Sequence, residues 1–134
     1  MIFVDTGFFL ALFNPKDELH GRAEAWAEAV SEPLLVTEYV LWECVNALSL
    51  PADRPTAHHL VEYVRAAGGF EVIAASPALW AAGLALHRSR LDKAWSLTDC
   101  ISFEVMRDRG AGRALAHDRH FEQAGFEALL RRAP

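Results

Sequence analysis

Short, continuous apolar runs alternate along this chain with segments of helical periodicity, and this alternation limits the possible folds more than any other feature. Residues 2–4, 33–36, 70–74 and 113–116 are predicted strands, and residues 126–130 are a candidate fifth. Strands that are apolar throughout are typical of parallel sheets buried on both faces. The pattern therefore predicts an α/β fold in which helices cover both faces of a mainly parallel sheet of four or five strands.

The segments between the apolar runs carry the start and stop signals of helices. Thr37 and Ser76 are N-cap residue types at the start of two helices, and Thr98 is one at the start of a third. Pro15 is placed to end the helix over residues 8–13, and Pro51 to end the helix that Thr37 starts. The predicted helices span residues 8–13, 17–30, 38–50, 56–67, 78–88 and 98–109.

Length and composition are typical of one globular unit. The chain has 134 residues, of which 52% are hydrophobic and 23% charged, and no linker or repeat divides it. We therefore expect a single domain over residues 1–134. No apolar run approaches the roughly 18 residues of a membrane span, and no export signal opens the sequence, so we expect a cytoplasmic protein that does not associate with membranes.

The charge balance does not decide whether nucleic acid is a partner. The net charge of −5 argues against it. However, residues 88–134 hold nine of the thirteen basic side chains against seven acidic ones. Carboxylates that bind a metal ion would have their charge neutralised, which would remove part of the net negative charge of the chain. Composition alone therefore does not exclude an RNA substrate.

Four carboxylates occupy equivalent positions in this predicted topology. Asp5 ends the first strand, and Asp118 follows the fourth. Glu43 lies on the helix after the second strand, and Asp99 lies in the first turn of the helix opened by Thr98. Because sites in such folds lie beyond the carboxyl ends of the strands, we expect these four side chains to meet at one edge of the sheet.

A cluster of carboxylates points to a hard divalent cation. Clustered carboxylates repel unless a cation lies among them, and oxygen ligands suit Mg²⁺ or Mn²⁺. Such ions activate water and polarise phosphodiesters, so the pattern predicts metal-assisted phosphodiester hydrolysis. Three of the four acids also have a purely structural interpretation: Asp5 as a turn former, Asp99 as a favourable helix N-terminal charge and Asp118 as a helix cap.

Four segments in order along the chain resemble the motifs of the PIN-domain family, and within it the VapC-type toxins of bacterial toxin–antitoxin pairs. Together they span nearly the whole sequence. The matching segments are Val4–Leu12, Thr37–Leu48, Ser96–Phe103 and Asp118–Phe121 with Gly125–Phe126.

The resemblance implies a three-layer α/β/α PIN-like fold and an Mg²⁺- or Mn²⁺-dependent endoribonuclease. By position, Asp5, Glu43, Asp99 and Asp118 would be the catalytic and metal-binding acids. The supporting side chains would be Thr6, Thr98 and Asn46. Many relatives carry Thr, Ser or Gly two places before the fourth acid, where this chain has Ala116, so any hydroxyl contribution is missing there.

The resemblance also implies partners: an RNA substrate, a cognate antitoxin that inserts a basic side chain among the acids, and a second copy in a homodimer. Two alternatives stay open at this stage. One is a free-standing PIN nuclease of RNA processing, and the other is a non-catalytic PIN-like module that binds RNA or protein. A phosphoaspartate enzyme is disfavoured because Gly7 stands where a haloacid-dehalogenase-type phosphatase has its second Asp.

Several other side chains are candidates for RNA contacts. Arg119 and His120 follow the fourth acid, and Trp95 precedes the Asp99 helix in a position where it could stack on a base. A phosphate-binding rim is a further hypothesis, with Arg107, Arg109, Arg113 and Arg119 as its members. Arg107 and Arg109 are equally explained as favourable charges at the C-terminus of a helix. The His117-x-x-His120 spacing lacks the additional Cys or His ligands of a zinc site, so a zinc site is disfavoured.

Overall fold

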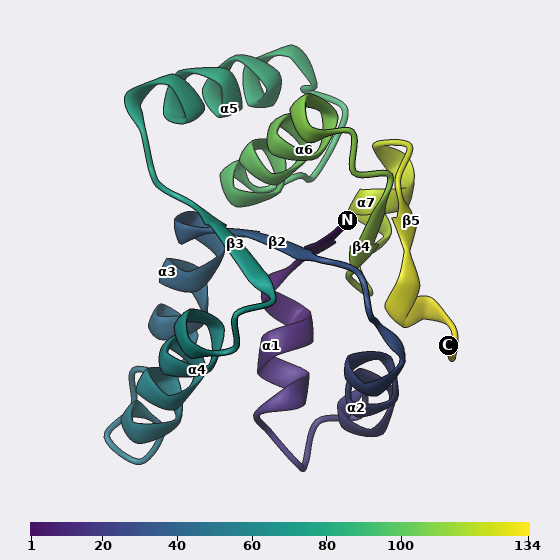
Figure 1. Ribbon diagram of the computed structural model, residues 1–134. Helices are drawn as coiled ribbons and strands as arrows, with labels where there is room; N and C mark the ends of the chain where they lie inside the picture. The colour runs from purple at the N-terminus through teal and green to yellow at the C-terminus, as the bar shows by residue number, and fades with distance from the viewer.

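The computed structural model describes all residues 1–134 as five strands and seven α-helices with a short 3₁₀-helix near the C-terminus (Figure 1). The strands are β1 (Ile2–Val4), β2 (Leu34–Thr37), β3 (Phe70–Ile73), β4 (Arg113–Leu115) and β5 (Glu127–Ala128). The helices are α1 (Thr6–Leu12), α2 (His20–Ala29), α3 (Glu38–Ala47), α4 (Arg54–Ala66), α5 (Pro77–Ser89), α6 (Leu97–Arg109) and α7 (Arg119–Gln123), followed by η1 (Leu129–Arg131).

All five strands form one parallel sheet in the order β3-β2-β1-β4-β5. Helices α5 and α6 lie on one side of this sheet, and α1, α2 and α4 lie on the other (Figure 1). Helix α3 contacts α1 and α4, and it also reaches α6 on the opposite side. The predicted three-layer α/β/α architecture is confirmed, and β1 lies at the centre of the sheet.

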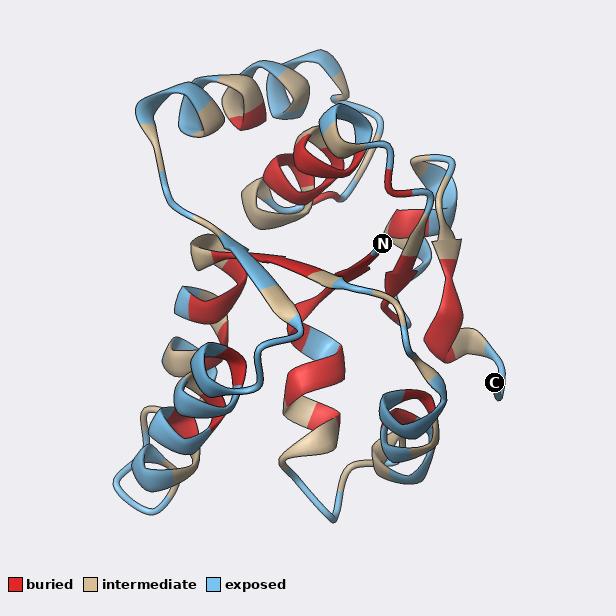
Figure 2. Ribbon diagram, viewed as in Figure 1, coloured by how far each residue is buried: buried red, intermediate tan, exposed pale blue.

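The core consists of 28 buried hydrophobic residues in one cluster. Strands β1 and β2 are buried along almost their whole length, whereas the edge strand β3 is half-exposed (Figure 2). Aromatic rings fill the space between β1 and the helices: Phe103 of α6 packs edge-on against Phe121 of α7, with ring centroids 5.0 Å apart. Gly83 lets α5 approach α6, because a Cβ atom there would collide with Ile101. This packing fixes the position of α6, whose first turn carries Asp99.

The predicted elements agree with the observed ones to within a few residues, with two corrections. Helix α6 is capped by Ser96 rather than by Thr98. The candidate fifth strand is a strand only at Glu127–Ala128, because the chain then turns into η1 and Leu130 N donates to the carbonyl of Ala116. None of the helices combines the length and the hydropathy that crossing a membrane requires.

Candidate active site

Two of the predicted acids follow neighbouring strands of the sheet. Asp5 comes directly after β1, and Asp118 lies three residues after β4, which pairs with β1 in parallel. The backbone N–H of Asp5 donates to the carbonyl of Leu115, at 3.2 Å, which extends this pairing beyond the strand ends. The topology thus brings residues that are far apart in the sequence to one edge of the sheet.

The other two acids come from helices that flank this edge. Glu43 lies in α3 and Asp99 in the first turn of α6. All four carboxylates line one cleft of about 380 Å³, together with Thr6, Ser96, His117 and His120. The expectation that these four acids meet therefore agrees with the structure.

Hydrogen bonds hold the acids on both sides of the cleft. The Thr6 hydroxyl donates to Glu43 Oε1 at 2.6 Å. On the opposite side, His120 Nδ1 lies 2.9 Å from Asp99 Oδ2 and 3.3 Å from Asp118 Oδ1. The imidazole therefore links two of the four acids, and Thr6 orients a third.

Asp5 is the most strongly perturbed group of the cleft. Its side chain is buried, and burial raises the pKa of its carboxyl from 3.8 to about 7. The value of about 7 includes the charges of Asp99, Glu43 and Asp118, which also raise the pKa, and a hydrogen bond with the Thr6 backbone, which lowers it. Burial also raises the pKa of Asp99, against the opposing effect of its hydrogen bonds to Ser96 and His120. Perturbed carboxyls in a cleft are typical of functional sites.

The donor chemistry of the cleft fits a hard divalent cation. Its carboxylate oxygens are the ligands that Mg²⁺ prefers, and a cation would offset the repulsion that raises the pKa of Asp5. No three Asp, Glu, His or Cys side chains converge closely enough to form a ready ligand set. Mg²⁺ keeps several waters and needs only one or two protein carboxylates, so Asp5 and its neighbours match that requirement.

Two of the predicted supporting residues lie outside the acidic cleft. Thr98 and Asn46 line a neighbouring pocket of about 400 Å³ that Glu43 also borders. This second pocket is mainly apolar and includes Trp42 and Trp80. Thr6 is therefore the one predicted supporting residue that the structure brings to the acids themselves.

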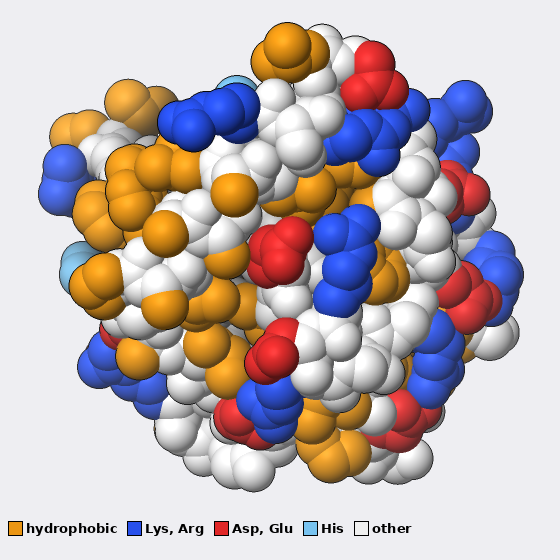
Figure 3. Space-filling model, turned by 90° about the horizontal axis from the view of Figure 1, so that it is seen from above, with side chains coloured by type: hydrophobic (Ala, Val, Ile, Leu, Met, Phe, Trp, Pro, Cys, Tyr) orange, Lys and Arg blue, Asp and Glu red, His pale blue; other side chains and the backbone are white.

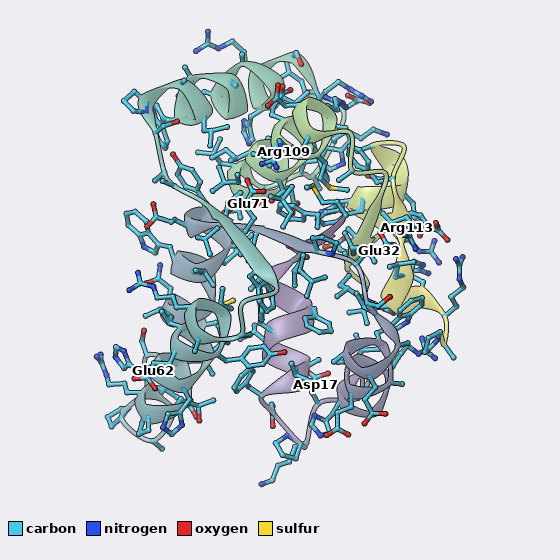
Figure 4. The ribbon with its side chains drawn as sticks, viewed as in Figure 1. Asp17, Glu32, Glu62, Glu71, Arg109 and Arg113 are labelled. Atoms are coloured by element: carbon cyan, nitrogen blue, oxygen red, sulfur yellow. The ribbon has the colours of Figure 1, made fainter.

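The predicted arginine rim is largely wrong. Arg109 pairs with Glu71 and Arg113 with Glu32, near the amino ends of the strands (Figure 4). Arg107 pairs with Glu104 on the solvent-facing side of α6. These guanidiniums neutralise nearby carboxylates and do not border the cleft.

The predicted stacking of Trp95 on a base does not agree with its burial. Only 4% of Trp95 is exposed, its ring packs edge-on against Phe103, and its Nε1 donates to Gln123. Both cysteines, Cys44 and Cys100, are buried and free.

Sequence reasoning missed Ser96, which forms a capping box with Asp99. The Ser96 hydroxyl accepts from Asp99 N, and Asp99 Oδ2 accepts from Ser96 N, each at 3.0 Å. The Ser-x-x-Asp spacing was the available signal, because it is the pattern of a capping box. Asp99 therefore belongs both to the cleft and to the helix cap.

Comparisons with known proteins agree with this geometry. The PIN domain model matches residues 2–127. The chain is 34% identical over 136 aligned positions to the 23S rRNA-specific endonuclease VapC20 of Mycobacterium tuberculosis, covering 94% of this chain and 95% of that relative.

Two solved structures resemble this fold. The crystal structure of Mycobacterium tuberculosis VapC20, described as a sarcin–ricin loop cleaving toxin, superposes with a TM-score of 0.87 at 28% identity, over 94% of this chain and 96% of that one. FitAcB from Neisseria gonorrhoeae shares the fold, with a TM-score of 0.66 at 17% identity over 96% of both chains. The chain belongs to the PIN-domain family and, within it, to the VapC-type branch.

Proposed function

We propose that this chain is an endoribonuclease that hydrolyses RNA phosphodiester bonds with Mg²⁺ or Mn²⁺, and that it is the toxin of a VapBC-type toxin–antitoxin pair acting in the cytoplasm. The supporting observation is the single cleft lined by Asp5, Glu43, Asp99 and Asp118. Its relative VapC20 is named as a 23S rRNA-specific endonuclease. A ribosomal RNA loop is therefore the first substrate class to test.

The mechanism assigns a separate task to each wall of the cleft. Asp5, Glu43, Asp99 and Asp118 would hold the cation, which when bound activates water and neutralises charge on the phosphate. Thr6 keeps the Glu43 carboxylate oriented on one wall. His120 keeps Asp99 and Asp118 together on the other. Held in this way, the acids need little rearrangement when the substrate arrives.

A cognate antitoxin is the proposed regulator of this site. A basic side chain inserted into the cleft would pair with the same carboxylates that hold the cation. Asp5 and Asp99 line the cleft and are mostly buried, so a long Lys or Arg side chain is the chemistry that would reach them.

Removal of divalent metal ions is expected to abolish RNA cleavage by this protein. The purified chain, freed of any antitoxin, is incubated with a 23S rRNA fragment that contains the sarcin–ricin loop, in Mn²⁺ and in EDTA. We expect cleavage in Mn²⁺, none in EDTA, and full recovery when excess Mn²⁺ is added back, because the acids repel one another and the phosphate without a cation. Equal cleavage in EDTA would contradict the metal dependence. Absence of both cleavage and calorimetric Mn²⁺ binding would contradict the nuclease.

The homodimer is proposed to form through an exposed aromatic face. Trp42 of α3 is 65% exposed and Trp80 of α5 is 51% exposed, and both line the apolar pocket beside the acidic cleft. Hydrophobic side chains gather on one side of the molecule seen from above (Figure 3). Monomeric proteins rarely expose apolar patches of this kind, and a second copy would cover it.

A charge placed on this face is expected to separate the copies. We expect Trp80→Glu to convert a dimer to a monomer in light scattering, because burying an unpaired carboxylate in an apolar interface costs several kcal/mol, on the order of 3–5. The matched control is Leu91→Glu, since Leu91 is 90% exposed and lies outside the pocket. A monomeric wild-type protein, or a Trp80→Glu variant that stays dimeric, would refute this interface.

A further inference from the structure

A second groove continues from the acidic cleft. It has a volume of about 640 Å³ and lies between α1, the turn before α2 and the start of α7. Five residues border both hollows, so the two form one continuous depression: Gly7, Leu10, His117, Asp118 and His120. A strand bound across the acids would therefore have a path out of the cleft along this groove.

The groove contains one of the few unpaired cations of the basic C-terminal part. Between residues 88 and 134, seven of the nine basic side chains pair with a carboxylate: Arg90, Lys93, Arg107, Arg109, Arg113, Arg131 and Arg132. The two without such a partner are Arg88 and Arg119. Arg119 is exposed and lines the groove, whereas Arg88 lines neither hollow. An unpaired guanidinium beside a nuclease cleft is free to bind an anion.

Hydrogen bonds and an ion pair hold the other residues that line the groove in place around Arg119. Arg131 Nη1 donates to the carbonyl of His117 at 3.0 Å, and its Nε lies 2.8 Å from Glu122. Gln123 Oε1 accepts from Trp95, which leaves the Gln123 amide group as a donor. Asp17 also lines the groove, with Oδ1 occupied by the backbone N–H of Leu19 at 2.8 Å.

We propose that Arg119 binds a backbone phosphate of the RNA strand next to the scissile bond, and that this groove guides the strand away from the acids. A guanidinium presents a planar fork of donors that matches phosphate oxygens. Such a contact fixes the position of the strand without selecting its sequence. The proposal rests on the proposed function, since it assumes that the acids act on RNA.

The first test measures binding, so that its result does not depend on cleavage. Affinity for a sarcin–ricin loop oligonucleotide is measured in EDTA over a range of salt concentrations, for the wild type, Arg119→Gln and Arg88→Gln. We expect Arg119→Gln to weaken binding about tenfold and to reduce the slope of log affinity against log salt by about 0.7, the loss of one phosphate contact on a single strand. Arg88→Gln should match the wild type, and an Arg119→Gln variant that also matches it would overturn the proposal.

A second test locates the contact on the RNA. One phosphate at a time is replaced by a neutral methylphosphonate, and each oligonucleotide is bound to the wild type and to Arg119→Gln. At one position next to the cleaved bond, we expect the substitution to weaken binding to the wild type and to have no further effect on the variant. Additive losses at every position would overturn the proposal. Wild-type cleavage in Mn²⁺ is measured in parallel, so a failed nuclease and a failed phosphate site give different results.

Discussion

The Asp5→Asn variant is expected to lose RNA cleavage and, at the same time, to be more stable than the wild type at pH 8 without metal. Asn has the shape of Asp but carries no charge. The wild-type carboxyl is buried among three other acids, and its pKa is raised to about 7. At pH 8 the metal-free protein therefore holds an unfavourable buried charge that the variant lacks.

The sign of the pH dependence follows from the direction of this shift. The folded protein binds the Asp5 proton more tightly than the unfolded chain does, so the protonated carboxyl stabilises the fold below pH 4. That stability is lost progressively as the pH rises from about 4 through 7. A shift from 3.8 to about 7 corresponds to roughly 4 kcal/mol as an upper limit, so we expect Asp5→Asn to gain on the order of 2–4 kcal/mol at pH 8.

Urea denaturation in EDTA at pH 5 and pH 8 measures this effect. The difference between Asp5→Asn and the wild type should be clearly smaller at pH 5 than at pH 8, because only part of the stability that the wild type loses between pH 4 and pH 7 is lost by pH 5. The control is Asp108→Asn, which removes an exposed charge at the far end of α6. If Asp5→Asn were less stable than the wild type at pH 8, or if it still cut RNA, Asp5 would be a structural turn residue.

The sheet and the meeting of the acids could be predicted because both depend on local patterns. Ile2–Val4 is apolar throughout and ends in Asp5, and such runs favour buried parallel strands with polar residues at their carboxyl ends. Once the strands are parallel, topology brings Asp5 and Asp118 to the same edge. No side-chain detail is needed for that conclusion.

The partners of the arginines could not be predicted, because they depend on packing between distant segments. Arg109 meets Glu71, which is 38 residues away, and Arg113 meets Glu32, which is 81 residues away. The composition of the C-terminal part indicated a basic surface, but most of its cations are neutralised by such pairs. Only the folded chain shows that Arg88 and Arg119 lack a carboxylate partner, and that Arg119 is the one of the two that lines the groove.

The burial of Trp95 has a similar explanation. Its position before the Asp99 helix made it a candidate for stacking on a base, yet the ring packs against Phe103, and the Arg90 guanidinium lies over it, 4.9 Å from the ring centroid. A large aromatic side chain gains more free energy from such burial than the loop loses by becoming ordered. The composition of a loop therefore predicts the exposure of its backbone better than it predicts whether one tryptophan side chain in it is buried.

Replacement of Asp99 by asparagine is expected to separate the two tasks of this residue. The Asp99 carboxylate accepts from Ser96 N in the helix cap and faces His120 in the cleft. Asn keeps an oxygen that can accept from Ser96 but removes the charge that a cation requires. We expect the rate of RNA cleavage to fall by about a hundredfold or more, since even changes to residues behind metal ligands cost 10–100-fold. The free energy of unfolding should change by less than about 1 kcal/mol.

Ser96→Ala is the matched variant, because it removes the cap and leaves every carboxylate in place. Loss of an N-cap serine costs about 1 kcal/mol, so this variant should melt earlier than the wild type and still cut RNA at a rate within a few fold of it. Cleavage of the sarcin–ricin loop RNA in Mn²⁺ and thermal unfolding in EDTA are measured for both variants. If Asp99 served only the helix, Asp99→Asn would instead resemble Ser96→Ala, with lower stability and nearly full activity. We therefore expect Asp99→Asn to lose cleavage and keep its stability, and Ser96→Ala to lose stability and keep cleavage. The reason is that the charge of Asp99 serves the cleft, whereas its hydrogen bond serves the helix.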